Sequence, residues 1–225
     1  MLQENIETVR KRLNKAAAKR GIPVEEITLV AVTKTIPAAR IQSARELGIK
    51  DFGENRLQEA LPKINSLSPE INWHFLGHLQ TNKVKDVLPY FKLIHSLDRM
   101  KLAHVLQKEA LKIDKVVDVL VQVNIGSEET KYGFEPELVE EALKELVSLD
   151  MIKIRGLMAI APLLEDPEEL RPHFRRLNRM FQSLNIPGTE MKYLSMGMTN
   201  DFEVAVEEGS NMVRIGTALF GERVK

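Results

Sequence analysis

The stretch VVDVLVQVNIG at residues 116–126 is the longest apolar run of the chain, and the segments that follow it decide the fold. Its β-branched residues are typical of a strand that is covered on both faces. Residues 136–149 begin with Pro136, which is favoured in the first turn of a helix, and then repeat apolar residues at helical spacing. KIRGLMAI at 153–160 is the next predicted strand. A strand, a helix and a strand joined by short loops predict a parallel sheet with right-handed crossovers.

The same alternation extends to both ends of the chain. Strands are predicted at 27–34, 50–55, 72–77, 93–98, 116–126, 153–160, 193–197 and 212–216. Helical segments follow them at 36–48, 56–67, 80–91, 99–113, 136–149, 170–184 and 199–209, with a short segment at 217–225. A charged helix precedes the first strand, and no Pro- or Ser-rich linker interrupts the pattern. We therefore predict one α/β domain over 1–225, a (β/α)8 TIM barrel with an extra N-terminal helix. An open doubly wound sheet is the alternative.

Composition excludes several classes of protein. The chain has 225 residues, of which 44% are hydrophobic and 28% charged, so it can bury a core and is not a disordered tail. Its 32 basic and 32 acidic side chains cancel, which argues against nucleic acid or an anionic membrane as a partner. No run approaches the ~18 apolar residues that span a bilayer, and no secretory signal is evident. The absence of cysteine excludes disulfides, thiolate metal sites and a cysteine nucleophile. We expect a cytoplasmic globular protein.

In such a barrel the working groups lie where the strands end. Lys34 ends the first strand, after apolar residues that favour the neutral amine needed for Schiff-base chemistry. The simpler interpretation is a charged strand terminus that reaches water. Arg214 precedes Gly216 by two residues and shares its face of the last strand. Because the last strand closes against the first, Arg214 is expected near Lys34. The alternative for Arg214 is a salt bridge with a glutamate on a helix.

Two clusters of small residues follow the seventh and eighth strands. SMGMT at 195–199 and GTA at 216–218 offer backbone N–H groups of the kind that bind phosphate. Glycine in such places also serves simple turns. His74 and His78 lie in a strand and its following loop, so their spacing does not place both on one helical face, and we predict no metal site.

Six motifs occur in order along the chain: AVTKTIP at 31–37, GENR at 53–56, WHFLGHLQTNK at 73–83, RGLMAI at 155–160, LSMGMTND at 194–201 and MVRIGTALFG at 212–221. With these motifs the chain resembles the pyridoxal-phosphate homeostasis protein family over nearly its whole length. It is also similar to the barrel domain of alanine racemase and of fold-type III decarboxylases.

The resemblance implies pyridoxal 5'-phosphate (PLP) as cofactor, held as a Schiff base on Lys34. It also implies that Arg214 faces the pyridine nitrogen and that Asn55 lies near the ring. The phosphate would be held by Ser195 and by the backbone at Gly197, Met198, Gly216 and Thr217. Relatives often have serine where this chain has Thr199, and either hydroxyl can donate.

The resemblance further implies a carrier rather than a catalyst. A charged arginine can only donate to the pyridine nitrogen, which leaves that nitrogen unprotonated and weakens carbanion chemistry. Alanine racemases add a β-domain, whereas this sequence ends nine residues after Gly216. We therefore expect a monomer without catalytic residues that acts in vitamin B6 and amino-acid homeostasis and supplies PLP to apo-enzymes. One alternative is a PLP-dependent racemase or decarboxylase with Tyr132 or His78 as second acid/base group. Another is a cofactor-free isomerase of a phosphorylated sugar.

Overall fold

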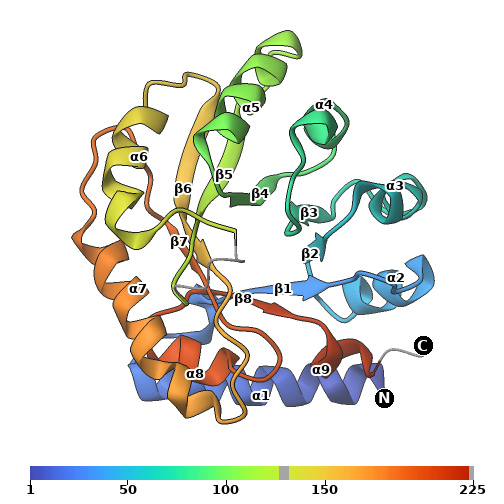
Figure 1. Cartoon of the computed structure of the whole chain (residues 1–225). Coiled ribbons are helices and arrows are strands. Elements are labelled where there is room, and N and C mark those ends of the chain that lie inside the picture. The colour runs from blue at the N-terminus through green and yellow to red at the C-terminus, as the bar shows by residue number, and fades with distance from the viewer. Residues whose placement is uncertain (127–131, 223–225) are drawn as a thin grey trace.

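The strands form a closed barrel. The computed structural model describes residues 1–126 and 132–222, and within these ranges eight parallel strands pair in chain order, with the last against the first (Figure 1). They are β1 (Thr28–Val32), β2 (Asp51–Glu54), β3 (Asn72–Phe75), β4 (Leu93–Leu97), β5 (Val117–Val123), β6 (Ile152–Ala159), β7 (Tyr193–Ser195) and β8 (Met212–Ile215). The pairing of β8 with β1 confirms the predicted barrel and excludes the open sheet.

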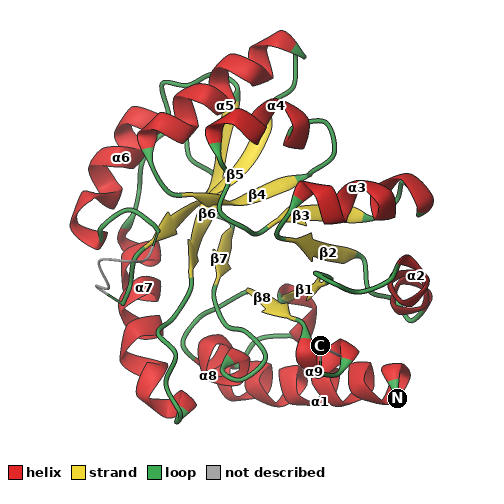
Figure 2. Ribbon diagram, turned by 45° about the vertical axis from the view of Figure 1, so that its right-hand side comes forward, coloured by secondary structure: helices red, strands yellow, loops and turns green. Residues whose placement is uncertain are grey.

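Helices surround the ring of strands (Figure 2). They are α1 (Leu2–Arg20), α2 (Ala38–Glu46), α3 (Leu57–Ser66), α4 (Val84–Val87), α5 (Met100–Lys112), α6 (Val139–Leu146), α7 (Arg171–Ser183), α8 (Phe202–Glu207) and α9 (Thr217–Phe220). The helix predicted at 80–91 is much shorter than expected: Thr81–Lys83 form a 3-10 turn before it, and Pro89 after it has no backbone N–H to donate to the preceding turn. In this part of the chain, no helix has the length and apolarity needed to cross a membrane.

The first helix completes the outer layer beside the last two. Helix α1 lies along α8 and α9 (Figures 1 and 2). Its apolar stripe is buried, and Asn5 Nδ2 donates to the carbonyl of Leu219 at 3.0 Å. Since α9 has only four residues, it is too short to cover the strands beside it. Helix α1 therefore takes the place that a longer last helix would occupy.

The barrel interior has an apolar part and a polar part. Its apolar cluster consists of Val30, Leu93, Leu120, Met158 and Met212. Histidine, serine and arginine side chains from β3, β4, β7 and β8 are also buried inside. The polar part underlies the site described next.

Candidate functional site

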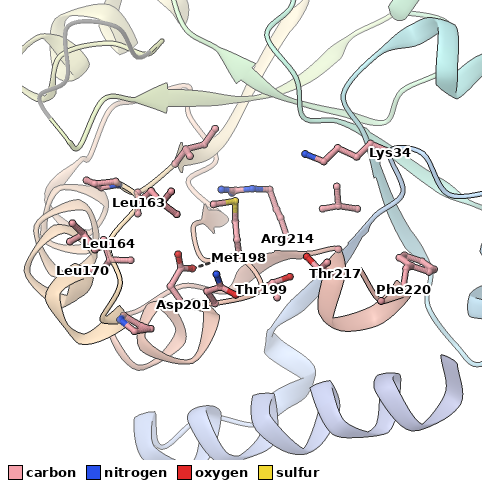
Figure 3. A pocket seen from close by; sticks show the side chains of 18 of the residues that line it. Lys34, Leu163, Leu164, Leu170, Met198, Thr199, Asp201, Arg214, Thr217 and Phe220 are labelled. Atoms are coloured by element: carbon pink, nitrogen blue, oxygen red, sulfur yellow. Dashed lines mark hydrogen bonds between the residues drawn. The ribbon is translucent and has the colours of Figure 1, made fainter. Parts of the chain in front are cut away.

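A cavity of about 420 Å³ lies at the C-terminal ends of β1, β6, β7 and β8. Lys34 and Arg214 both line it, as expected from the closure of the barrel. Val30 pairs with Arg214 across β1 and β8, and alternate residues of a strand face the same side, so Val30, Val32 and Lys34 point inward. In Figure 3 Lys34 enters from one side, while Leu163 and its neighbours stand opposite. The cavity thus joins one amine, one guanidinium and an apolar wall.

Arg214 is held from behind by uncharged acceptors. Its Nη1 donates to the carbonyl oxygen of Ser195 at 2.8 Å and to the Ser195 hydroxyl at 2.6 Å. Its Nη2 donates to the carbonyl of Ala159 at 2.8 Å. These partners differ from the helix-borne glutamate that was the alternative. Burial lowers the pKa of Arg214 to about 10, although the charge of Asp201 opposes the shift. At neutral pH the guanidinium is therefore a fixed cationic donor.

The loops after β7 and β8 form another wall of the cavity. Met198, Thr199, Gly216 and Thr217 line it. The two loops meet where the backbone N–H of Ala218 donates to Thr199 Oγ1 at 3.5 Å. One wall of the cavity therefore combines the Thr199 hydroxyl with the backbone of the loops after β7 and β8, and such a wall is suited to an anionic group.

Gly197 shapes the first of these loops without lining the cavity. Its φ of +93° lies in the left-handed region, where side chains are disfavoured. A Cβ at this position would lie 2.6 Å from the Cβ of Ala205 and 3.0 Å from the Cα of Phe202. Glycine is therefore needed here both for backbone conformation and for close packing on α8.

Asp201 is a carboxylate on the lining that the sequence did not single out. It accepts from the backbone N–H of Met198 at 2.5 Å, so this N–H is already bonded to the protein (Figure 3). Burial raises the pKa of Asp201, while that hydrogen bond and the Arg214 charge act in the opposite direction. An anionic ligand on this wall would lie near a buried carboxylic acid.

Ser195 and Asn55, both expected to contact the ligand, lie outside the lining. Ser195 is fully buried behind Arg214, and its second partner is His95 Nδ1 at 3.3 Å. Thr199 is the hydroxyl residue that the loop presents to the cavity. Asn55 lines a separate cavity of about 410 Å³ together with His78. The backbone takes a left-handed conformation at Gly197, between Ser195 and Thr199, and sequence alone could not show which hydroxyl would then face the cavity.

The histidines singled out in the sequence lie in two different places. His74 is buried and meets His95, with Nδ1 2.9 Å from Nε2. His78 Nδ1 is 2.9 Å from Asp98 Oδ2, and its ring stacks on Tyr132 with centroids 3.8 Å apart. Neither His78 nor Tyr132 lines the Lys34 cavity. Across residues 1–126 and 132–222, no three His, Asp or Glu side chains gather as metal ligands.

A buried ion pair anchors the residue before Lys34. Lys63 Nζ lies 2.7 Å from Glu54 Oε1 and donates to the carbonyl of Thr33 at 2.7 Å. The Thr33 hydroxyl donates to the same Glu54 oxygen at 2.6 Å. This cluster ties the end of β1 to β2 and α3, and so fixes where the Lys34 side chain begins.

The chain is similar in sequence to proteins of a known family. Residues 1–224 match the family model described as alanine racemase, N-terminal domain. The pyridoxal phosphate homeostasis protein of Aquifex aeolicus is 46% identical over 222 residues, 98% of this chain and 97% of that protein.

Two solved structures have a fold similar to that of this chain. The structure of PipY of Synechococcus elongatus PCC7942 with PLP bound is 33% identical, with a TM-score of 0.83, over 98% of this chain and 100% of that one. Alanine racemase of Clostridium difficile 630 is 16% identical with a TM-score of 0.77, over all of this chain and 57% of the racemase, which is a likeness in fold.

Proposed function

Because the chain belongs to the pyridoxal phosphate homeostasis protein family, which shares the N-terminal barrel of alanine racemase, we propose that it binds PLP in the Lys34 cavity and holds it for delivery. The observation that carries the proposal is the meeting of Lys34, Arg214 and the β7 and β8 loops at one cavity. PLP presents an aldehyde, a pyridine ring and a phosphate, and when bound it supplies an electrophilic carbon and an electron-accepting ring.

The residues present fit each part of this cofactor. Lys34 is the proposed attachment point: its amine condenses with the aldehyde carbon, a C=N bond forms and one water leaves. Arg214 is the proposed donor to the pyridine nitrogen, which it leaves unprotonated. Thr199 and the backbone of Gly216 and Thr217 are the proposed phosphate contacts. A cavity of about 420 Å³ is within the size range of small-ligand sites.

We assign Ser195, Gly197 and Met198 supporting roles in this site. Ser195 orients Arg214 from behind, and Gly197 sets the path of the loop. The side chain of Met198 lines the cavity, while its N–H is bonded to Asp201. These roles differ from direct phosphate contacts, and they follow from where the side chains and N–H groups point.

The lining supports a carrier better than a catalyst. Racemisation by two bases needs a second proton-transfer group opposite Lys34. The described lining contains neither His nor Tyr. Its carboxylate, Asp201, has one oxygen bonded to Met198. We therefore propose storage of PLP and its supply to apo-enzymes that require it, without turnover of an amino acid.

Trapping the covalent adduct tests the site. Purified protein incubated with PLP and borohydride should gain the mass of one reduced adduct on the peptide that contains Lys34. Lys34→Arg preserves the positive charge but cannot form a C=N bond, so it should show no adduct. An adduct that persists on another lysine in Lys34→Arg contradicts the assignment.

Turnover is tested separately with a panel of amino acids. The loaded protein should leave their chirality and carboxylates unchanged. Steady racemisation at about 1 s⁻¹ or faster contradicts the carrier role and leaves PLP binding intact.

A further inference from the structure

A line of hydrogen-bonded polar side chains crosses the barrel interior from the buried Arg214 to the partly exposed Asp51. Arg214 Nη1 lies 2.6 Å from Ser195 Oγ, which lies 3.3 Å from His95 Nδ1. His95 Nε2 lies 2.9 Å from His74 Nδ1, and His74 Nε2 lies 3.0 Å from Asp51 Oδ1. The links come from β8, β7, β4, β3 and β2 in turn. Of these five residues, Arg214 is the one that lines the cavity described above.

The two ends of this hydrogen-bonded line fix the direction of its first and last hydrogen bonds, and one neutral arrangement then satisfies the bonds between them. A guanidinium can only donate, and an ionised carboxylate can only accept. Ser195 therefore accepts from Arg214 and donates to His95 Nδ1. His95 in turn donates from Nε2 to His74 Nδ1, and His74 donates from Nε2 to Asp51. Both imidazoles are then neutral Nε2–H tautomers, and each proton of the chain has an acceptor.

The opposite direction leaves a buried proton without an acceptor. If both imidazoles donated toward Arg214, Ser195 Oγ would accept twice, and its own proton would face no further partner among those the structure records for it. Burial is the main cause that lowers the pKa of His95 well below its ordinary value, and the positive charge of Arg214 adds to it.

Asp51 is suited to be the accepting end. Burial acts to raise its pKa, whereas the hydrogen bonds from His74 and Asn72 and the positive charge of Lys92 act to lower it. Its side chain is 24% exposed. Asp51 is the first residue of β2, so it lies at the end of the barrel opposite the cavity. The line of hydrogen bonds therefore connects the two ends of the barrel through its interior.

We propose that His95 and His74 are positioning residues for the cofactor site. They hold the Ser195 hydroxyl as an acceptor toward Arg214 and so keep the guanidinium aimed as a donor into the cavity. The identity of the ligand rests on the proposed function, whereas the direction of the chain is a property of the protein without ligand. The two parts can therefore be tested separately.

The direction is tested by NMR on protein that contains no PLP. Two-bond ¹H–¹⁵N correlations of ¹⁵N-histidine-labelled protein distinguish the two neutral tautomers from the charged ring, and His74→Gln and His95→Gln assign the signals. At pH 7 both histidines should be neutral with the proton on Nε2. A proton on Nδ1 of either ring overturns the proposed direction.

The effect on the site is tested with a matched pair of serine variants. Ser195→Ala and Ser210→Ala each remove a fully buried hydroxyl. The Ser210 hydroxyl donates to the backbone carbonyls of Leu194 and Met196, and it is not hydrogen-bonded to any of the five residues of the line from Arg214 to Asp51. Ser195→Ala should raise the Kd for PLP and for unphosphorylated pyridoxal by the same factor, about tenfold. Ser210→Ala should change both by less than about twofold at a similar loss of thermal stability.

The possible results separate the two proposals. If Ser195→Ala loses affinity only for the phosphorylated ligand, Ser195 contacts the phosphate, and its role in aiming Arg214 is overturned. Unchanged affinity for both ligands also overturns that role. If the parent binds no PLP, the proposed function fails, and the NMR result still shows whether the hydrogen bonds run in the proposed direction.

Discussion

Replacing Gly197 by alanine should destabilise the protein through two separate costs. The first is conformational, because φ of +93° is disfavoured for a residue with a Cβ, by about 1–2 kcal/mol. The second is steric, because the new Cβ would lie 2.6 Å from that of Ala205 on α8. Overpacking of this kind typically costs about 1–3 kcal/mol. The sum is about 2–5 kcal/mol, which for a chain of this size lowers Tm by roughly 4–20 °C.

Two further glycines provide controls for the two costs. Gly21 has φ of +75° and nothing within 4 Å of the added Cβ, so Gly21→Ala should show the conformational cost alone. Gly216 has a negative φ, and its Cβ would meet Val32 at an ordinary 3.5 Å. Gly216→Ala should therefore change stability by less than about 1 kcal/mol. Because Gly216 lines the cavity, it should still weaken PLP binding.

Thermal unfolding followed by circular dichroism, in protein without cofactor, measures all three variants. The difference between Gly197→Ala and Gly21→Ala estimates the steric cost. If the two lose the same stability, the close packing of the β7–α8 loop on α8 is refuted. PLP titration of Gly216→Ala then tests the cavity wall independently of stability.

Four other variants test the site and its supports. Thr199→Val should raise the Kd for PLP roughly tenfold in a binding titration and leave pyridoxal binding unchanged, because only the phosphate loses a donor; equal losses place Thr199 elsewhere. Asp201→Asn retains an acceptor for the Met198 N–H and removes a negative charge from the cavity wall, so PLP should bind more tightly to this variant. Because burial raises the pKa of Asp201 in the folded protein, the parent should also lose stability relative to Asp201→Asn as the pH rises through that pKa. Lys63→Met leaves the Glu54 carboxylate without its cation and should cost about 3–5 kcal/mol in urea unfolding, most of which the double variant with Glu54→Gln should restore. His95 binds its proton more weakly when folded than when unfolded, so the parent should lose stability as the pH falls below 6.5, and His95→Gln should lose less; equal slopes contradict a neutral buried His95.

The barrel could be predicted because its strands and helices are periodic and regular. Eight apolar runs, each followed by a helical segment, leave few topologies, and closure then brings Lys34 and Arg214 together. These two residues end or nearly end their strands, so the strand direction alone places them at the same end of the barrel. Position along a strand was sufficient evidence for both.

The rest depended on side-chain directions that no periodicity reports. Whether Ser195 or Thr199 faces the cavity depends on the left-handed backbone conformation of Gly197 between them. His95 lies in a fully buried strand, and nothing in its local sequence shows that β3 and β7 bring His74 and Ser195 to it. Asn55 follows β2 as predicted but borders a neighbouring cavity. Such orientations are set by long-range packing in loops and in the barrel interior, and the local sequence does not report them.

The position of α1 has a consequence during synthesis. Asn5 and Leu219 are hydrogen-bonded although 214 residues separate them. At translation rates of roughly 5–20 residues per second, α1 emerges roughly 10–40 s before α9. During that time the stripe of Ile6, Val9 and Leu13 lacks the helices that cover it in the finished barrel. The nascent chain therefore exposes the apolar stripe of this otherwise charged helix until α8 and α9 have been synthesised, and ribosome-bound intermediates should be more prone to aggregate than the finished barrel.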